Sequence, residues 1–137
     1  MRISEFKDIE KFLTEHHVFG ECIIEEFRLI EYGTTFEVAI NYIWDVTGEL
    51  RPNIDVPEII VLRLRSVQEL HINNALTQEM LRHPEDINWG LNEIAGIKLV
   101  SDTVEADSEH SFIHLAFVWE GDRRIDVIFS QFEVVFN

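Results

Sequence analysis

The stretch from residue 35 to residue 46 alternates between large apolar side chains and polar or smaller ones, and this alternation restricts the fold strongly. One set of alternate positions holds five large apolar residues: Phe36, Val38, Ile40, Tyr42 and Trp44. The other set holds Glu37, Ala39, Asn41, Ile43 and Asp45. Because side chains on a strand point alternately to opposite faces, the pattern predicts a half-buried strand. Burying each large apolar side chain contributes about 1.5–3 kcal/mol, so we expect this strand at the centre of the core.

The segment before this strand predicts its partner in a hairpin. Residues 22–30 have the character of a strand, and residues 31–34 that of a turn. A four-residue loop predicts three apolar cross-strand pairs: Leu29 with Phe36, Phe27 with Val38, and Ile23 with Tyr42. The same register places Glu25 opposite Ile40 on the core face. Either a bulge turns Glu25 outward or its carboxylate is buried, and we expect the bulge because a buried charge is costly.

Helical and strand periodicities predict the remaining elements. Apolar residues at helical spacing predict an amphipathic helix over residues 4–16, with Ser4 as its N-cap and Gly20 marking its end. The further elements are a central strand over 59–64, irregular extended structure over 67–72, a short helix over 75–82 capped by Asn74, a strand over 97–104, a hairpin of 113–119 and 125–129 around the loop 120–122, and a last strand over 131–136. We therefore predict an α+β fold: a mainly antiparallel β-sheet with the N-terminal helix packed on one face and a short second helix.

The charge of the chain is strongly negative, with 26 acidic and 11 basic residues and a formal net charge of -15. This charge disfavours binding to nucleic acid or to an anionic membrane, and it favours either a basic protein partner or simply solubility. A length of 137 residues, 46% of them hydrophobic, fits one α+β domain over residues 1–137. Cys22 is the single cysteine, and the start of the sequence lacks the apolar core of a signal peptide, so we expect a cytoplasmic protein.

The reactive residue types do not fall into a recognised catalytic or metal-binding motif. Four possible zinc ligands lie within seven residues: His16, His17, Glu21 and Cys22. Their spacing matches no known zinc site. His110 and His114 would lie about 13 Å apart along a strand, too far to share one ion. The sequence has neither a nucleophile elbow nor a phosphate-binding glycine loop. We therefore expect no catalytic residue, no metal and no cofactor.

Two groups of acidic residues are the main candidates for a binding site. The first group is Asp102, Glu105, Asp107 and Glu109, and the second is Glu120 and Asp122 at the predicted hairpin tip. Loops held by a rigid sheet concentrate binding residues, and clustered acids speed the encounter with a cationic partner. Trp89 lies in a polar loop and is a candidate anchor for a partner. The sequence thus predicts a non-catalytic module that binds a basic protein.

The order of the predicted elements, in a small acidic chain, resembles that of immunity proteins from bacterial toxin–immunity systems. The matching stretches are Val61–Leu70 and Ile125–Phe129. One such family often opens its first strand with Phe-His-Asp, where this chain has Phe19-Gly20-Glu21. The resemblance implies an α+β protein that binds and neutralises a basic toxin, and it assigns no functional residue.

Two other functions stay open from the residues alone. One is a small-molecule-binding or hydrolytic domain. The other is a structural homodimer subunit, in which an exposed C-terminal strand pairs edge to edge with a second copy of the chain.

Overall fold

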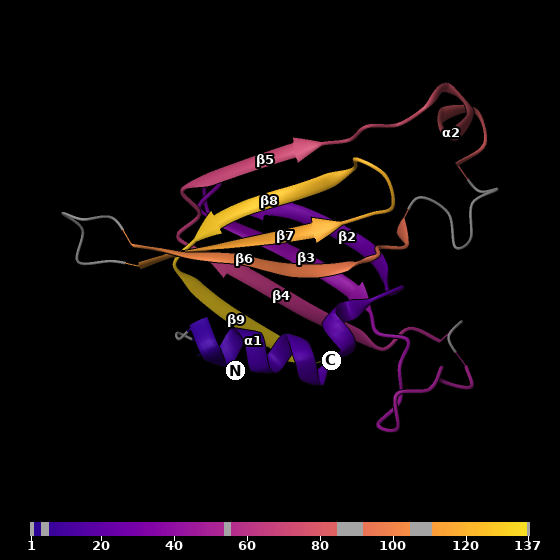
Figure 1. The fold of residues 1–137 in the computed structure, drawn as a ribbon, viewed down its shortest axis with the longest axis horizontal. Helices are drawn as coiled ribbons and strands as arrows, with labels where there is room; N and C mark the ends of the chain where they lie inside the picture. Colours follow the sequence, from indigo (N-terminus) through magenta and orange to yellow (C-terminus); the bar gives the residue numbers. More distant parts are fainter. Residues whose placement is uncertain (1, 4–5, 54–55, 85–91, 105–110, 137) are drawn as a thin grey trace.

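The computed structural model describes residues 2–3, 6–53, 56–84, 92–104 and 111–136, and for residues 101–104 and 111 it describes the backbone alone. The strands form two antiparallel sheets (Figure 1). The first sheet has the order β1 (Arg2–Ile3), β9 (Gln131–Phe136), β4 (Ile59–Arg65), β3 (Thr35–Asn41) and β2 (Ile23–Ile30). The second has the order β5 (Glu69–Asn73), β8 (Arg124–Phe129), β7 (Ser111–Val118) and β6 (Gly96–Val104). The helices are α1 (Phe6–Glu15), the short 3-10 turn η1 (His17–Phe19) and α2 (Gln78–Arg82).

One antiparallel ribbon passes from the first sheet into the second. The strand β4 continues into β5, and β8 continues into β9, with Leu64 opposite Phe132 before the corner and Glu69 opposite Ile128 after it. Ser66 adopts a left-handed conformation with φ 57° at the corner. Strands that bend from one sheet into another join two sheets around a common core. The bend therefore connects both sheets through a single pair of strands.

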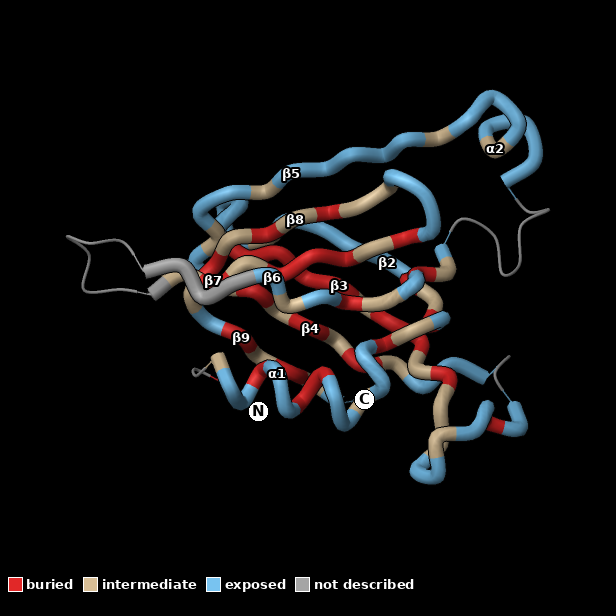
Figure 2. The backbone as a smooth tube through the Cα atoms, viewed as in Figure 1, coloured by how far each residue is buried: buried red, intermediate tan, exposed pale blue. Residues whose placement is uncertain are grey.

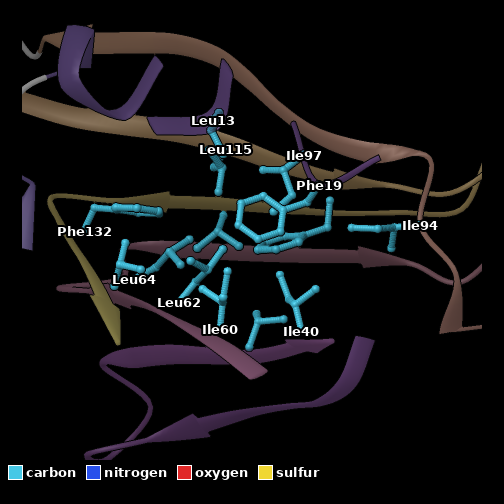
Figure 3. Close-up of a cluster of buried hydrophobic side chains, with 14 of the residues drawn as sticks. Leu13, Phe19, Ile40, Ile60, Leu62, Leu64, Ile94, Ile97, Leu115 and Phe132 are labelled. Carbon is cyan, nitrogen blue, oxygen red and sulfur yellow. The ribbon is translucent and has the colours of Figure 1, made fainter. Parts of the chain in front are cut away.

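The core lies between the two sheets and is closed on one side by α1. Figure 2 shows buried residues along β3, β4, β7 and β8, and Figure 3 shows Leu13 of α1 above a cluster that includes Leu62 and Leu115. Ile9 and Phe12 are buried as well, and the ring centroid of Phe12 lies 5.8 Å from that of Phe132. The predicted α+β fold, with mainly antiparallel sheets and an N-terminal helix on the core, is confirmed.

The predicted hairpin of β2 and β3 is confirmed with one correction. Leu29 pairs with Phe36 and Phe27 with Val38, as the apolar pattern predicts. A bulge lies between Ile24 and Glu26, and Glu25 is exposed. Because the bulge adds one residue to β2, the register shifts by one beyond it. The predicted pair of Ile23 with Tyr42 is therefore wrong, and Ile23 lies opposite Asn41.

The C-terminal half follows the predicted order. Phe117 pairs with Ile125, the register that a three-residue loop requires. The helix α2 begins at Gln78, and the side chain of Thr77 caps it by accepting a hydrogen bond from the Met80 N–H, so Asn74 is not its cap. Ser4, the predicted cap of α1, lies outside the described residues.

The last strand is not the free edge that the homodimer alternative requires. The strand β9 lies between β4 and β1, and β1 pairs with it at Phe132 and Glu133. Edge-to-edge pairing of two copies along β9 would have to displace β1. Among the described helices, none has the length and apolar character needed to cross a bilayer.

Candidate functional site

The outer face of the first sheet carries a row of paired charges, which we name the arginine–glutamate ladder. It consists of Arg2, Arg28, Arg63, Arg65, Glu31, Glu37 and Glu133. At its centre Arg63 Nε donates to Glu37 Oε2 at 2.7 Å, and Arg63 Nη1 donates to Glu133 Oε1 at 3.0 Å. Alternation along β3 puts Glu37 on the face opposite Phe36 and Val38. The polar face of this strand is thus covered by guanidinium groups from its neighbours.

The ladder is almost neutral within a strongly acidic chain. It holds four arginines and three glutamates, a net charge of +1. Because the whole chain has a net charge of -15, all the other residues together carry a net charge of -16. The hydrogen bond from Arg63 lowers the pKa of the Glu37 carboxyl, and Arg63 lowers the pKa of Glu133 in the same way. Both carboxylates stay charged and paired. The excess negative charge must therefore lie elsewhere on the surface.

Glu21, Glu93 and Glu120 come from separate segments, and the charges of Glu21 and Glu120 both act on Glu93, so we name these three carboxylates the acidic cluster. Backbone hydrogen bonds bring the segments together: the Glu21 N–H donates to the Ile94 carbonyl at 2.8 Å, and the Ala95 N–H donates to the Val118 carbonyl at 2.7 Å. Glu93 also forms a bridge with Ile23. Burial raises the pKa of the Glu93 carboxyl, and the charges of Glu21 and Glu120 raise it further. In the described part of the chain, no cation forms an ion pair with any of the three.

The structure separates the acidic residues that the sequence singled out. Glu120 and Asp122 are exposed between β7 and β8, as expected for a hairpin tip (Figure 1). The backbone of Asp102 lies opposite Ile113, near the end of β7 that is farther from that tip. Glu105, Asp107, Glu109 and Trp89 lie outside the described residues. Sequence reasoning considered Glu21 only as a possible zinc ligand and missed Glu93, because the arrangement with Glu120 depends on hydrogen bonds between distant segments that no local pattern marks.

A strained turn carries one member of the acidic cluster. His17, Val18 and Phe19 all have left-handed φ values, of 54°, 49° and 57°, and Glu21 follows with 61°. Each such residue costs about 1–2 kcal/mol, and a β-branched residue such as Val18 is a rare occupant. Gly20, the residue type that adopts a left-handed conformation most readily, instead has φ -56°. Backbone strain of this kind gathers at functional sites, so the turn is a candidate for function.

A cleft of about 700 Å³ is also bordered by this turn. Its walls come from the end of α1, the turn and the loop after β3, and include Glu15, His16, His17, Tyr42, Trp44, Asp45, Val46, Arg51 and Glu58. The indole N–H of Trp44 donates to the Gly20 carbonyl at 2.8 Å, which fixes the ring against the turn. The ring of His17 lies 6.0 Å from that of Trp44. The residues between His17 and Glu21 therefore border both the cleft and the acidic cluster.

Arg51 is the basic residue among the cleft walls, and its donors are occupied by the protein itself. Its Nε donates to the Tyr42 carbonyl at 2.6 Å, and its Nη2 donates to Asn41 Oδ1 at 2.9 Å. Its Nη1 reaches the carbonyls of Asn53 and Val56. Arg51 is buried, so it holds the loop in place and leaves little donor capacity for an anionic ligand.

The residues with possible metal or catalytic roles have structural surroundings. Burial raises the pKa of the Cys22 thiol to about 11, which keeps it protonated and unreactive. His16 Nδ1 donates to the Phe12 carbonyl at 2.8 Å, and its ring stacks on Phe19. Within the described residues, no three His, Cys, Asp or Glu side chains are placed to hold a metal ion.

A close histidine–carboxylate contact lies on the second sheet. His114 Nε2 is 2.6 Å from Asp126 Oδ1, and Arg124 donates to both oxygens of the same carboxylate. A histidine oriented by a carboxylate can act as a base when a nucleophile faces it. Here Asp126 also accepts hydrogen bonds from Arg124, so its carboxylate links the side chains of His114 and Arg124.

Comparison of the chain with protein families, with curated proteins and with solved structures finds no match. The function is therefore inferred from the arrangement of charge and shape described above.

Proposed function

We propose that the chain is a non-catalytic module that binds a basic protein through an acidic surface centred on the acidic cluster. Glu120 comes from the hairpin tip that the sequence analysis selected, and Glu21 and Glu93 extend the surface around it. The clustered charge raises the local negative potential and accelerates the encounter with a cationic partner.

The observation that carries the proposal is the unpaired approach of the three carboxylates. Partial burial and two like charges raise the pKa of Glu93, so the fold holds this group where its charged form is disfavoured. The arginines of the ladder do not neutralise the acidic cluster, because they pair with Glu31, Glu37 and Glu133. A cationic side chain from a partner would relieve the repulsion, and the relief adds to the free energy of binding.

The most specific form of the proposal is an immunity protein that binds and neutralises a basic toxin. Its support is the resemblance of Val61–Leu70 and Ile125–Phe129 to such proteins, together with the charge of -15. The competing explanation is that the acids only keep the protein soluble. The two explanations differ in whether the position of the carboxylates matters or only their number.

The test compares two triple variants with the same formal net charge. In the cluster variant Glu21, Glu93 and Glu120 become Gln, and in the control variant the exposed Glu10, Glu49 and Glu79 become Gln. The wild-type chain first captures its partner from its source cells at low ionic strength, and mass spectrometry identifies the partner. Stopped-flow association of the purified partner is then measured with all three proteins.

We expect the partner to be basic and the cluster variant to associate at least about tenfold more slowly at low salt, because electrostatic steering changes on-rates by 10-fold or more. The control variant should lose less than about threefold, and the difference should shrink in 1 M salt, where the Debye length is about 3 Å. A partner that is not basic, or equal slowing of both variants, would show that the acids serve solubility.

A further inference from the structure

We infer that the cleft beside the strained turn binds a cationic side chain, and specifically the guanidinium group of an arginine that the basic partner inserts. The inference rests on the proposed function, because it names the contact through which the partner would be held after the acidic cluster has attracted it. The cleft has three features that suit this ligand: a fixed aromatic platform, surrounding carboxylates and no available cation.

The aromatic platform is the indole of Trp44. Its N–H is bound to the Gly20 carbonyl at 2.8 Å, so the ring cannot rotate freely and its orientation is set before a ligand arrives. Trp44 remains partly exposed towards the cleft. The ring of His17 stands near it, and Gly48 passes close to that ring, since a Cβ on Gly48 would lie 3.2 Å from His17 Cε1. An arginine guanidinium is planar and stacks on an aromatic face, and Trp is the strongest aromatic partner for a cation.

Three carboxylates line the same cleft. Asp45 accepts hydrogen bonds from the Thr47 hydroxyl at 2.6 Å and from the Glu49 N–H at 3.0 Å, which lower the pKa of its carboxyl and keep it charged. Glu15 and Glu58 have side chains that are 58% and 63% exposed. Glu15 lies 3.8 Å from Lys11 Nζ and Glu58 lies 3.6 Å from Arg51 Nε, and exposed ion pairs of this kind contribute little, so a ligand cation can compete for both carboxylates. A guanidinium between carboxylates and an aromatic face gains both charge-assisted hydrogen bonds and stacking.

Anionic ligands suit the cleft less well. The guanidinium of Arg51 points its donors at main-chain carbonyls and at Asn41, and Glu58 lies 3.6 Å from its Nε. With three carboxylates against one arginine, the charged side chains of the walls sum to -2 when both histidines are neutral. A phosphate or a carboxylate ligand would meet this repulsion without a free donor to offset it.

The test uses Nα-acetyl-arginine methylamide as the probe and its citrulline analogue as an uncharged control of the same shape. The indole N–H signal of Trp44, assigned by its loss in Trp44→Phe, is followed by NMR during titration of the full chain at low salt. We expect a saturable shift with the arginine probe, at least tenfold weaker binding of the citrulline probe, and weaker binding of the lysine analogue because ammonium does not stack as a plane.

Matched variants locate the site. The double variant Glu15→Gln, Glu58→Gln should weaken arginine binding about tenfold, since each carboxylate near a cation contributes a few-fold at low salt. The double variant Glu10→Gln, Glu49→Gln removes the same charge from the same helix and the same loop but outside the cleft walls, and should change binding less than twofold. An unchanged amide spectrum elsewhere verifies that both variants keep the fold.

Several results would overturn the inference. They are the absence of a saturable shift at Trp44, equal binding of the citrulline probe, stronger binding of the lysine probe, or equal effects of the two double variants. If these occur while a basic partner still depends on the acidic cluster, the proposed function stands and the cleft plays no part in it. If arginine binds but the captured partner is not basic, the proposed function fails and so does the assignment of the arginine to that partner.

Discussion

A glutamate carboxyl has its pKa lowered in the arginine–glutamate ladder and raised in the acidic cluster. In the ladder, Glu37 is almost buried and receives hydrogen bonds from Arg28 and Arg63, which lower the pKa of its carboxyl. In the cluster, burial and two neighbouring carboxylates raise the pKa of Glu93. The comparison teaches that the negative charge of this chain is not spread evenly. The fold pairs carboxylates where they support the sheet and leaves them unpaired at one end of the second sheet.

The largest expected effect comes from removing a carboxylate from the ladder. Glu37→Gln keeps the shape of the side chain but leaves Arg28 without its charged acceptor, and it leaves Arg63 paired with Glu133 alone. Hydrogen bonds to charged groups contribute about 1.5–3 kcal/mol, so we expect the free energy of unfolding at pH 7 to fall by about 2 kcal/mol. Urea denaturation measures it. A loss below about 0.5 kcal/mol would mean that the ladder is no more than a set of surface ion pairs.

The strained turn should give the next largest effect, with the opposite sign. Val18 has φ 49° and is 44% exposed, so Val18→Gly relieves backbone strain at the cost of the part of the side chain that is buried. We expect an increase of about 1 kcal/mol in the free energy of unfolding, because a left-handed conformation costs a non-glycine residue about 1–2 kcal/mol. The same denaturation experiment tests it. Destabilisation would show that the Val18 side chain contributes more by packing than its backbone costs.

The sequence predicts the ladder side of the molecule better than the cluster side. The strand over Thr35–Asn41 and the pairs Leu29–Phe36 and Phe117–Ile125 are local or depend on short loops, so the pattern determines them. The predicted continuation to residue 46 is wrong, because beyond Asn41 the buried residue is Ile43. The need to keep Glu25 out of the core likewise predicts its bulge. The pattern does not reveal that Glu37 is covered, because its arginine partners come from other strands. The alternation of apolar and polar residues along one strand therefore does not predict that its polar face is buried.

The cluster and the cleft depend on contacts between segments far apart in sequence. Glu21 and Glu93 meet Glu120 through backbone hydrogen bonds that no local periodicity records. The turn between α1 and β2 violates local preference, since Gly20 has an ordinary φ and Val18 a left-handed one. Local rules fail where tertiary contacts over-determine the backbone, which is a common property of functional sites.

A smaller effect should distinguish the cluster from the ladder by its pH dependence. Glu93→Gln removes the repelled charge, and we expect it to raise the free energy of unfolding at pH 7 by roughly 0.5 kcal/mol. Because the fold raises the pKa of Glu93 above its ordinary 4.5, the wild-type residue contributes favourably below pH 4.5, and that contribution is lost as pH rises through the raised value. The advantage of Glu93→Gln should thus appear only as pH rises.

The ladder predicts the reverse dependence. The pKa of Glu37 is lowered from 4.5, so its contribution is present above pH 4.5 and is lost as pH falls through the folded value. The penalty of Glu37→Gln should therefore be full at pH 7 and should shrink in acid. Urea denaturation of both variants between pH 3 and pH 8 gives the two difference curves. Curves with the same slope would refute the division of the carboxylates into paired and repelled groups.

The smallest expected effect is the response of these differences to salt at pH 7. Repulsion among Glu21, Glu93 and Glu120 acts through space near the surface, and the Debye length falls from about 30 Å at 0.01 M to about 3 Å at 1 M. The gain from Glu93→Gln should therefore disappear in 1 M NaCl. The ladder bonds are direct, with Arg63 Nε 2.7 Å from Glu37 Oε2, and direct partly buried contacts are screened much less. Most of the loss from Glu37→Gln should persist in 1 M NaCl. If 1 M NaCl abolishes the stability change of both variants equally, the ladder acts only through long-range attraction. The two regions would then differ only in whether the carboxylate stabilises or destabilises the fold.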